Sequence, residues 1–279
     1  MPSKNVQDQV AAPIVNLYNE SDEEHRLQHD LGPLEETRMR ELLERRLPPS
    51  PAELCDVGGA AGAYSFWLAE KGFSVSLVDV VPKHIEQAKQ RQIRSPETRL
   101  HSTIVGDARM LPFPADSFDC LLMHGPLYHL VNPADRRKAL AEALRVLRPN
   151  GVLIAVGITR YASLIYGLTV GSIWDPECLD MQEEGVRSGL HRNGFGFKKE
   201  LALDVSFHLP SELKDEIVNA GFRVMDCLGV LGPAWLAQDF DTSWKDPAKR
   251  EAIFRVARMT EGQPVLGPRT MVVASKAAL

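Results

Sequence analysis

The residues of this sequence that could carry chemistry follow short apolar runs. The first run leads into the segment Asp56-Val-Gly-Gly-Ala-Ala-Gly62, whose small residues let the backbone approach a ligand closely. Its glycines are Gly58, Gly59 and Gly62. The second run ends at Asp79-Val80, and a carboxylate at this point of a nucleotide-binding fold accepts hydrogen bonds from ribose hydroxyls. The pattern therefore predicts a site for a ribose-containing ligand.

Two further polar segments follow the next apolar runs. They are Gly106-Asp107-Ala108-Arg109 and His124-Gly125-Pro126-Leu127-Tyr128-His129. Taken singly, each has an ordinary structural explanation, because a glycine turn needs no ligand and an aspartate can cap a helix. Four such segments in succession are harder to explain in this way, since the carboxyl ends of parallel strands meet at one crevice of a sheet.

The segments that must position these residues alternate between apolar runs and helical patterns. We expect strands at 52–57, 73–80, 100–105, 118–123 and 152–158, and helices at 63–71, 82–93 and 133–147. Strands that are apolar throughout are covered by helices on both faces. The alternation predicts a doubly wound, mostly parallel α/β sheet. Two strands at 222–230 and 270–276 would bring it to seven, the last of them antiparallel.

Additional segments flank and interrupt this core. Residues 1–50 have spaced apolar positions that suit two short amphipathic helices separated near Gly32-Pro33, and we expect an N-terminal helical lid. Residues 51–279 are expected to form the main domain, with an insertion at 159–208 that serves as a substrate cap. The aromatic residues of the insertion favour a partly apolar pocket or a small core of its own; they are Tyr161, Tyr166, Trp174, Phe195, Phe197 and Phe207.

The composition is that of an ordinary globular protein. The 279 residues carry a net charge of -5, so the surface as a whole is not expected to attract nucleic acid. No apolar run approaches the ~20 residues that a membrane-spanning helix needs, and the N-terminus lacks a signal-peptide pattern. The four cysteines are scattered and form no metal-binding pattern. We expect a cytoplasmic monomer or homodimer without a bound metal.

Four motifs, in this order, resemble those of class I S-adenosylmethionine-dependent methyltransferases. They are DVGGAAG, LVDV, VGDARMLPFPADSFD and LRPNG, spread over residues 52–158. GDAR, GPLYHL and the segment Ile158-Thr-Arg-Tyr161 further resemble a subgroup of bacterial small-molecule-type methyltransferases. The chain departs from the family at Ala60, where glycine is usual. The resemblance implies a Rossmann-like domain that binds S-adenosylmethionine and releases S-adenosylhomocysteine.

The resemblance also implies which residues bind the cofactor. They are Tyr18, Asp56, Gly58, Gly59, Gly62, Asp79, Val80, Asp107, Ala108, Arg109, His124 and Gly125. Asp56 and the glycine turn would face the methionine part, Asp79 would bind the ribose, and Asp107 would lie at the adenine. His124 would lie beside the methionine moiety, near the transferred methyl group. Tyr18 resembles an N-terminal tyrosine that closes over the cofactor, although packing of an amphipathic helix also explains it.

Methyl transfer from a sulfonium requires a nucleophile held in line with the methyl–sulfur bond and the exclusion of water. A general base is needed only when the acceptor is protonated, and His124, Tyr128 and His129 are the candidates because the fourth strand positions them. Arg160 and Tyr161 follow the fifth strand and are candidates for binding the acceptor, which we expect to be a small molecule. Each of these residues also has a structural explanation, such as a surface arginine at position 160.

Three other functions are compatible with parts of this pattern. A nicotinamide-dependent oxidoreductase would need glycine in G-x-G-x-x-G where this chain has Ala60 and Ala63. A macromolecule methyltransferase would use the arginine-rich helix at 133–147, although such a helix face is usually solvated. A non-catalytic cofactor-binding protein would bind the same ligand without turnover.

Overall fold

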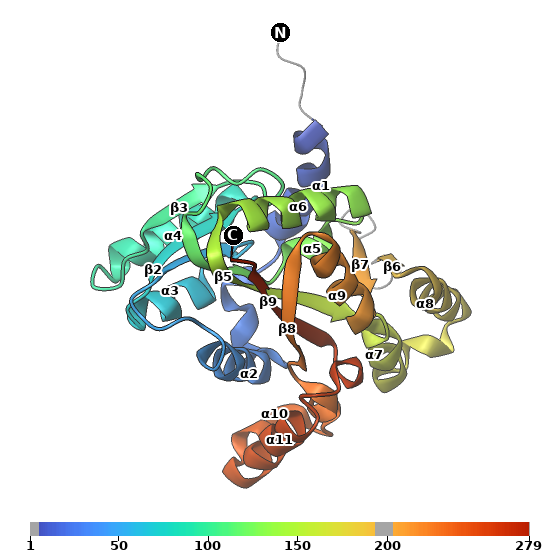
Figure 1. Cartoon of the computed structure of the whole chain (residues 1–279). Coiled ribbons are helices and arrows are strands. Elements are labelled where there is room, and N and C mark those ends of the chain that lie inside the picture. The colour runs from blue at the N-terminus through green and yellow to red at the C-terminus, as the bar shows by residue number, and fades with distance from the viewer. Residues whose placement is uncertain (1–5, 193–202, 279) are drawn as a thin grey trace.

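The computed structural model describes residues 6–192 and 203–278. Five parallel strands run in the order β3-β2-β1-β4-β5, and the sheet continues beyond β5 with β9, antiparallel to β5, and then β8, antiparallel to β9 (Figure 1). Their bounds are β1 Glu53–Val57, β2 Ser74–Asp79, β3 Ser102–Val105, β4 Phe118–Met123, β5 Leu147–Thr159, β8 Phe222–Gly229 and β9 Arg269–Lys276. The expected doubly wound, mostly parallel α/β sheet with an antiparallel last strand is confirmed.

Helices cover both faces of the sheet, as its apolar strands require. On one face lie α2 (Gly32–Glu44), α3 (Ala63–Glu70), α4 (Pro82–Arg94) and α11 (Pro247–Met259); on the other lie α6 (Pro133–Val146) and α9 (Pro210–Asn219). Met39 and Phe66 are fully buried in the first layer, and Leu140 and Leu213 in the second. Among the described helices, none combines the length and the apolar composition that crossing a membrane needs.

The register of the parallel strands brings their carboxyl ends to one edge. Val57, the last residue of β1, lies opposite Val78 of β2 and Met123 of β4. Asp79, which ends β2, lies opposite Val105, which ends β3. The segments that follow these four strands therefore emerge side by side, as the sequence predicted.

The insertion adds two strands that the sequence did not predict. They are β6 (Leu190–Arg192) and β7 (Asp204–His208), so the described residues hold nine strands rather than seven. The last two residues of β5, Ile158 and Thr159, pair in parallel with β7. Both lie in a glycine-rich stretch without a sustained apolar run, unlike the predicted strands of the core. The other elements in the described part of the insertion are α7 (Ala162–Val170), the 3₁₀ turn η2 (Ser172–Trp174) and α8 (Pro176–Ser188).

The N-terminal segment forms α1 (Val6–Glu20), a 3₁₀ turn η1 (Glu23–Gln28) and α2. Leu34 and Leu42 of α2 are fully buried in the core that covers one face of the sheet. Ile14 of α1 packs with Val81 and Leu203 in a separate small cluster. The two helices therefore differ in role, because α2 is part of the main core whereas α1 lies at the edge where the strands end.

Candidate functional site

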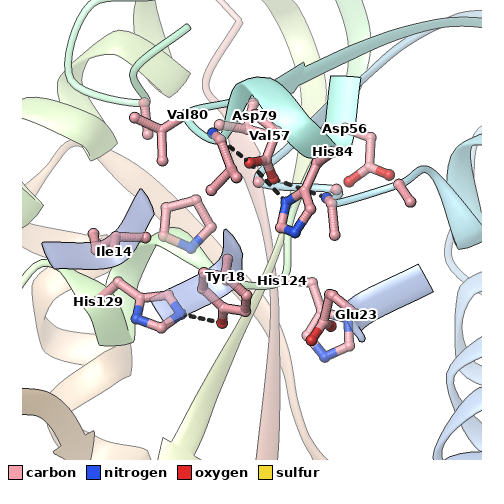
Figure 2. Close-up of a pocket in the computed structure, with 18 of the residues that line it drawn as sticks. Ile14, Tyr18, Glu23, Asp56, Val57, Asp79, Val80, His84, His124 and His129 are labelled. Atoms are coloured by element: carbon pink, nitrogen blue, oxygen red, sulfur yellow. Dashed lines mark hydrogen bonds and ion pairs between the residues drawn. The ribbon is translucent and has the colours of Figure 1, made fainter. Parts of the chain in front are cut away.

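A cavity opens where the parallel strands end. It holds about 1240 Å³ of space between atoms, a volume that includes its open mouth. The segments after β1, β2, β3 and β4 form one wall, and residues of α1 and η1 face them (Figure 2). Of the twelve residues implied to bind the cofactor, eleven line this cavity, and Gly62 does not.

The turn after β1 has room only for glycine at two positions. Gly58 has a φ of 73°, and a Cβ atom there would lie 2.7 Å from Cδ of Pro126. A Cβ atom at Gly59 would collide with the Asp56 carboxylate. Gly62, with a φ of 85°, precedes α3 and sets the start of that helix. Gly58 and Gly59 thus bring the backbone to the cavity wall, and Gly62 shapes the turn behind it.

Ala60 adopts the left-handed conformation that glycine favours, with a φ of 50°. The methyl group makes this conformation cost about 1 kcal/mol relative to glycine. The backbone N–H of Ala60 donates to Oδ2 of Asp79 at 2.9 Å. The departure from the family's glycine therefore leaves the turn intact and adds local strain.

Asp79 links the glycine turn to the helix that follows β2. Its Oδ1 accepts a hydrogen bond from the backbone N–H of Val81 at 2.9 Å and lies 3.1 Å from Nδ1 of His84 (Figure 2). His84 also lines the cavity, and its Nε2 is buried without a hydrogen-bond partner among the described residues. Sequence reasoning missed His84, although a histidine in the first turn of the helix after Asp79 was a usable signal.

Asp56 presents one unused oxygen at the end of β1. Its Oδ2 accepts a hydrogen bond from Oγ of Ser65 at 2.6 Å, whereas Oδ1 is buried with no hydrogen-bond partner in the described part of the chain. Burial raises the pKa of Asp56 to about 7, although the Ser65 hydrogen bond acts in the opposite direction. A ligand that donates a hydrogen bond or carries positive charge would stabilise the ionised form.

Asp107 and Arg109 form a rigid corner after β3. Oδ1 of Asp107 accepts from the backbone N–H of Arg109 at 2.8 Å, and the guanidinium returns to Oδ2 at 2.6 Å. Arg109 also lies 3.3 Å from Asp135 in the first turn of α6. The ion pairs hold Ala108 between them, where it lines the cavity.

The three residues expected to catalyse proton transfer are brought together at the end of β4. Nε2 of His129 lies 2.8 Å from Oη of Tyr18, and Nε2 of His124 lies 3.5 Å from Oε1 of Glu35 (Figure 2 shows the first pair). Burial lowers the pKa of His124 to about 3 and that of His129 to about 4. Both rings are therefore neutral near pH 7. Burial likewise raises the pKa of Tyr128, so its hydroxyl keeps its proton.

A buried ion cluster that sequence reasoning missed adjoins these histidines. Glu35 of α2 lies 3.2 Å from Nη2 of Arg26 in η1 and 3.5 Å from Nε of Arg269 in β9. Burial would raise the pKa of Glu35, but the Arg269 and Arg26 guanidiniums hold it well below its usual range. Local sequence patterns carry no sign of this cluster, because its members come from opposite ends of the chain.

A second cavity adjoins the first, with about 600 Å³ of space between atoms, its open mouth included. Both cavities are lined by Tyr18, Glu23, Arg26, Tyr128 and His129. Only the second is lined by Leu17, Ile158, Leu203, Val205 and Arg269. The pair of cavities thus provides two adjacent compartments that meet at the Tyr18–His129 hydrogen bond.

Arg160 and Tyr161, the candidates for binding the acceptor, line neither cavity in the described part of the chain. The Arg160 guanidinium instead forms an ion pair with Glu212 at 2.6 Å. Two aromatic residues of the insertion, Tyr166 and Trp174, are exposed. Phe207 stacks on His191, and Phe195 and Phe197 lie outside the described residues. A role of Arg160 and Tyr161 in acceptor binding stays a prediction.

Comparison with known proteins gives matches over part of the chain. Residues 55–155 match the family described as "Methyltransferase domain". The ubiquinone/menaquinone biosynthesis C-methyltransferase of Rickettsia massiliae is 29% identical over 154 residues, 53% of this chain and 61% of the relative. Nodulation protein S of Rhizobium tropici is 31% identical over 126 residues, 45% of this chain and 51% of the relative. The matches thus span less than two thirds of each relative.

Solved structures resemble a larger part of the chain. A methyltransferase from Methanosarcina mazei, titled S-adenosylmethionine-dependent, has a TM-score of 0.60 at 19% identity, covering 85% of this chain and 98% of its own. The N-methyltransferase NodS from Bradyrhizobium japonicum has a TM-score of 0.53 at 16% identity, covering 89% and 99%. At this level of identity the likeness concerns the fold. Residues 55–155 thus match a methyltransferase domain, and the fold resembles that of a structure described as an S-adenosylmethionine-dependent methyltransferase.

Proposed function

We propose that this protein transfers the methyl group of S-adenosylmethionine to a small-molecule acceptor. The observation that carries the proposal is the cavity at the strand ends, lined by eleven of the twelve residues implied to bind the cofactor. The names of two relatives support a small acceptor. One is the ubiquinone/menaquinone biosynthesis C-methyltransferase, and the other is a 2-methyl-6-phytyl-1,4-hydroquinone methyltransferase of Oryza sativa, 32% identical over 104 residues, 37% of this chain and 28% of the relative.

The polar groups of the first cavity fit this cofactor. Asp56 and His84 line the cavity, and Asp56 Oδ1 and His84 Nε2 are buried without a hydrogen-bond partner among the described residues, so each could bind a polar group of a ligand. Asp79 would bind the ribose hydroxyls, and the close backbone approach at Gly58 and Gly59 would admit the methionine part. The rigid Asp107–Arg109 corner would border the adenine.

The protein's contribution to the reaction would be positioning. When bound, S-adenosylmethionine supplies a methyl group on positively charged sulfur; the carbon–sulfur bond breaks as the acceptor–carbon bond forms. Tyr18, Tyr128 and His129 line both cavities and would hold the acceptor against the first compartment while excluding water. Neutral His129, whose Nδ1 has no hydrogen-bond partner among the described residues, or His124 would take the proton of a protonated acceptor, each as a weak base because burial lowers its pKa.

The flanking segments would complete the acceptor site. We infer that α1 and η1 of the N-terminal lid and the 159–208 insertion acting as a substrate cap enclose the second cavity, because Leu17, Leu203 and Val205 line it. Three statements stay predictions from the composition: that the protein is cytoplasmic, that it is a monomer or homodimer, and that it has no nucleic-acid partner.

Calorimetric titration of S-adenosylmethionine and S-adenosylhomocysteine into the purified full chain tests the proposal. We expect micromolar binding of both ligands, weakened at least about tenfold by Asp79→Asn, since hydrogen bonds to a charged group are lost. Asp215→Asn, at an exposed aspartate of α9, is the matched control and should bind as the wild type does. Well-folded protein that binds neither ligand would refute the proposal, and binding without turnover on any acceptor would leave a non-catalytic cofactor-binding protein.

A further inference from the structure

We propose that the second cavity recognises a carboxylate on a methyl acceptor that has an apolar body, and that Arg269 binds this carboxylate. The inference rests on the proposed function for its place in the reaction. It concerns a different compartment from the one that would hold the cofactor, and it names a residue that no motif of the sequence pointed to.

Arg269 has an incomplete set of partners for a buried guanidinium. Its Nε faces Glu35 at 3.5 Å, and the guanidinium carbon lies 5.5 Å from the ring centre of Tyr128. Nη1 is buried with no hydrogen-bond partner among the described residues, and the side chain keeps 18% of its surface exposed where it lines the second cavity. The planar edge of an arginine binds a carboxylate with two parallel hydrogen bonds. A ligand carboxylate would thus complete the coordination of Arg269.

The other charges around the cavity leave this cation available. Glu23 is engaged by Nε of Arg26 at 2.6 Å, and Glu35 is shared between Arg26 and Arg269. The lining histidine, His129, is neutral near pH 7 because burial lowers its pKa to about 4. The guanidiniums of Arg26 and Arg269 would repel a cationic acceptor and attract an anionic one. An anionic acceptor would also be attracted to the positively charged sulfur of the cofactor.

The remaining lining of the second cavity is apolar. Leu17 of α1, Ile158 of β5, and Leu203 and Val205 around β7 supply it. A ligand seated on Arg269 would therefore place a hydrocarbon or aromatic body against these side chains, which favours its transfer from water. Because Tyr18, Tyr128 and His129 line both cavities, such a ligand would also adjoin the first compartment. The combination describes a small amphiphilic carboxylic acid.

The test uses matched probe pairs on the full chain, with and without saturating S-adenosylhomocysteine. Phenylacetate, 4-hydroxybenzoate and octanoate are compared with their uncharged amides by calorimetry or ligand-observed NMR. At least one carboxylate should bind about tenfold or more tightly than its amide, because a charge-assisted pair of hydrogen bonds is made only with the acid. Arg269→Gln should remove this preference, and Arg269→Lys should retain part of it, since lysine keeps the charge without the planar fork.

Two controls separate the possible outcomes. Arg258→Gln, at an exposed arginine paired with Glu41, should leave the preference unchanged. S-adenosylhomocysteine affinity and thermal melting of the Arg269 variants show whether they remain folded. The inference would be overturned if acids and amides bound equally, or if no carboxylate bound. It would also be overturned if the preference for the acid were lost in Arg160→Gln but kept in Arg269→Gln. Failure of the wild type to bind S-adenosylhomocysteine would instead count against the proposed function. The comparison of acids with amides in the absence of S-adenosylhomocysteine would then still test the role of Arg269.

Discussion

The two cavities of this protein differ in how the chain assembles them. The first is built mainly from four consecutive strand ends, and the residues between Asp56 and Leu130 supply most of its wall. The second takes side chains from the N-terminal helix, the insertion and the last strand, as Leu17, Leu203 and Arg269 illustrate. A site made from successive turns of one sheet can be inferred from sequence order, whereas a site made from distant segments depends on how they pack.

The largest effect is expected from a substitution that breaks the ion cluster of Glu35, Arg26 and Arg269, which joins these distant segments. Glu35→Gln should lower the free energy of unfolding by about 3 kcal/mol, because the Arg26 and Arg269 guanidiniums lose their shared buried partner. Chemical denaturation measures this loss. The neighbouring Glu36→Gln removes an ion pair with the half-exposed Arg40 and should change stability by no more than about 0.5 kcal/mol. Equal effects of the two substitutions would mean that the cluster contributes no more than a surface pair.

A smaller effect is expected at the boundary between the cavities. Tyr18→Phe removes the hydroxyl that meets Nε2 of His129 at 2.8 Å and keeps the ring that lines both compartments. We expect a loss of about 1–2 kcal/mol in the free energy of unfolding, because a buried ring nitrogen is left unpaired. S-adenosylhomocysteine affinity should change less than about threefold. Tyr166→Phe, at an exposed tyrosine of α7, is the control. A large loss of cofactor affinity would place the Tyr18 hydroxyl in the first compartment instead.

The free energy of unfolding should depend on pH in opposite ways at the two buried histidines and at Asp56. His124 and His129 have folded pKa values of about 3 and about 4, so the stability they contribute is present above about pH 6.5 and is lost as the pH falls. Asp56, with a folded pKa of about 7, acts oppositely, because its contribution is lost as the pH rises from about 4 to about 7.

Between about pH 5 and about pH 6.5 the two histidines outweigh the single aspartic acid. We therefore expect the free energy of unfolding to rise with pH by roughly 1.3 kcal/mol per pH unit near pH 5, where about one net proton is involved, and by less toward pH 6.5, where the unfolded histidines lose their protons. Asp56→Asn should steepen this slope, and His129→Asn should flatten it. Urea denaturation of ligand-free protein across this range measures the slopes. A steeper slope in His129→Asn than in the wild type would contradict the neutral, buried state of that ring.

The smallest expected effect concerns the glycine turn of the first cavity. Ala60→Gly should increase the free energy of unfolding by up to about 1 kcal/mol, because relief of the left-handed strain exceeds the added freedom of the unfolded chain. Ala61→Gly is the matched control and should destabilise the protein, since its φ is not positive. Thermal or urea unfolding compares the two. Destabilisation by Ala60→Gly as well would mean that the methyl group makes packing contacts that outweigh the strain.

Most of the fold and of the first cavity was predictable from particular residues. The apolar runs ending at Val57, Asp79, Val105 and Met123 are strands within a few residues of the expected bounds. The strands β6 and β7 were not predicted, because they lie in the glycine-rich insertion, where no sustained apolar run marks a strand. His84 was missed although its signal was local, since it follows Asp79 in the first turn of α4.

The sequence by itself determined the alternation of strands and helices, and with it the edge at which Asp56, Asp79, Asp107 and His124 gather. Hydrophobic periodicity and turn chemistry act over a few residues, and parallel pairing then brings successive strand ends together. Only the tertiary structure decided that Arg269 faces Glu35, across 234 positions of the chain, and that Arg160 turns toward Glu212 instead of a cavity. Contacts between such distant segments depend on the packing of whole helices and strands, which no local pattern encodes.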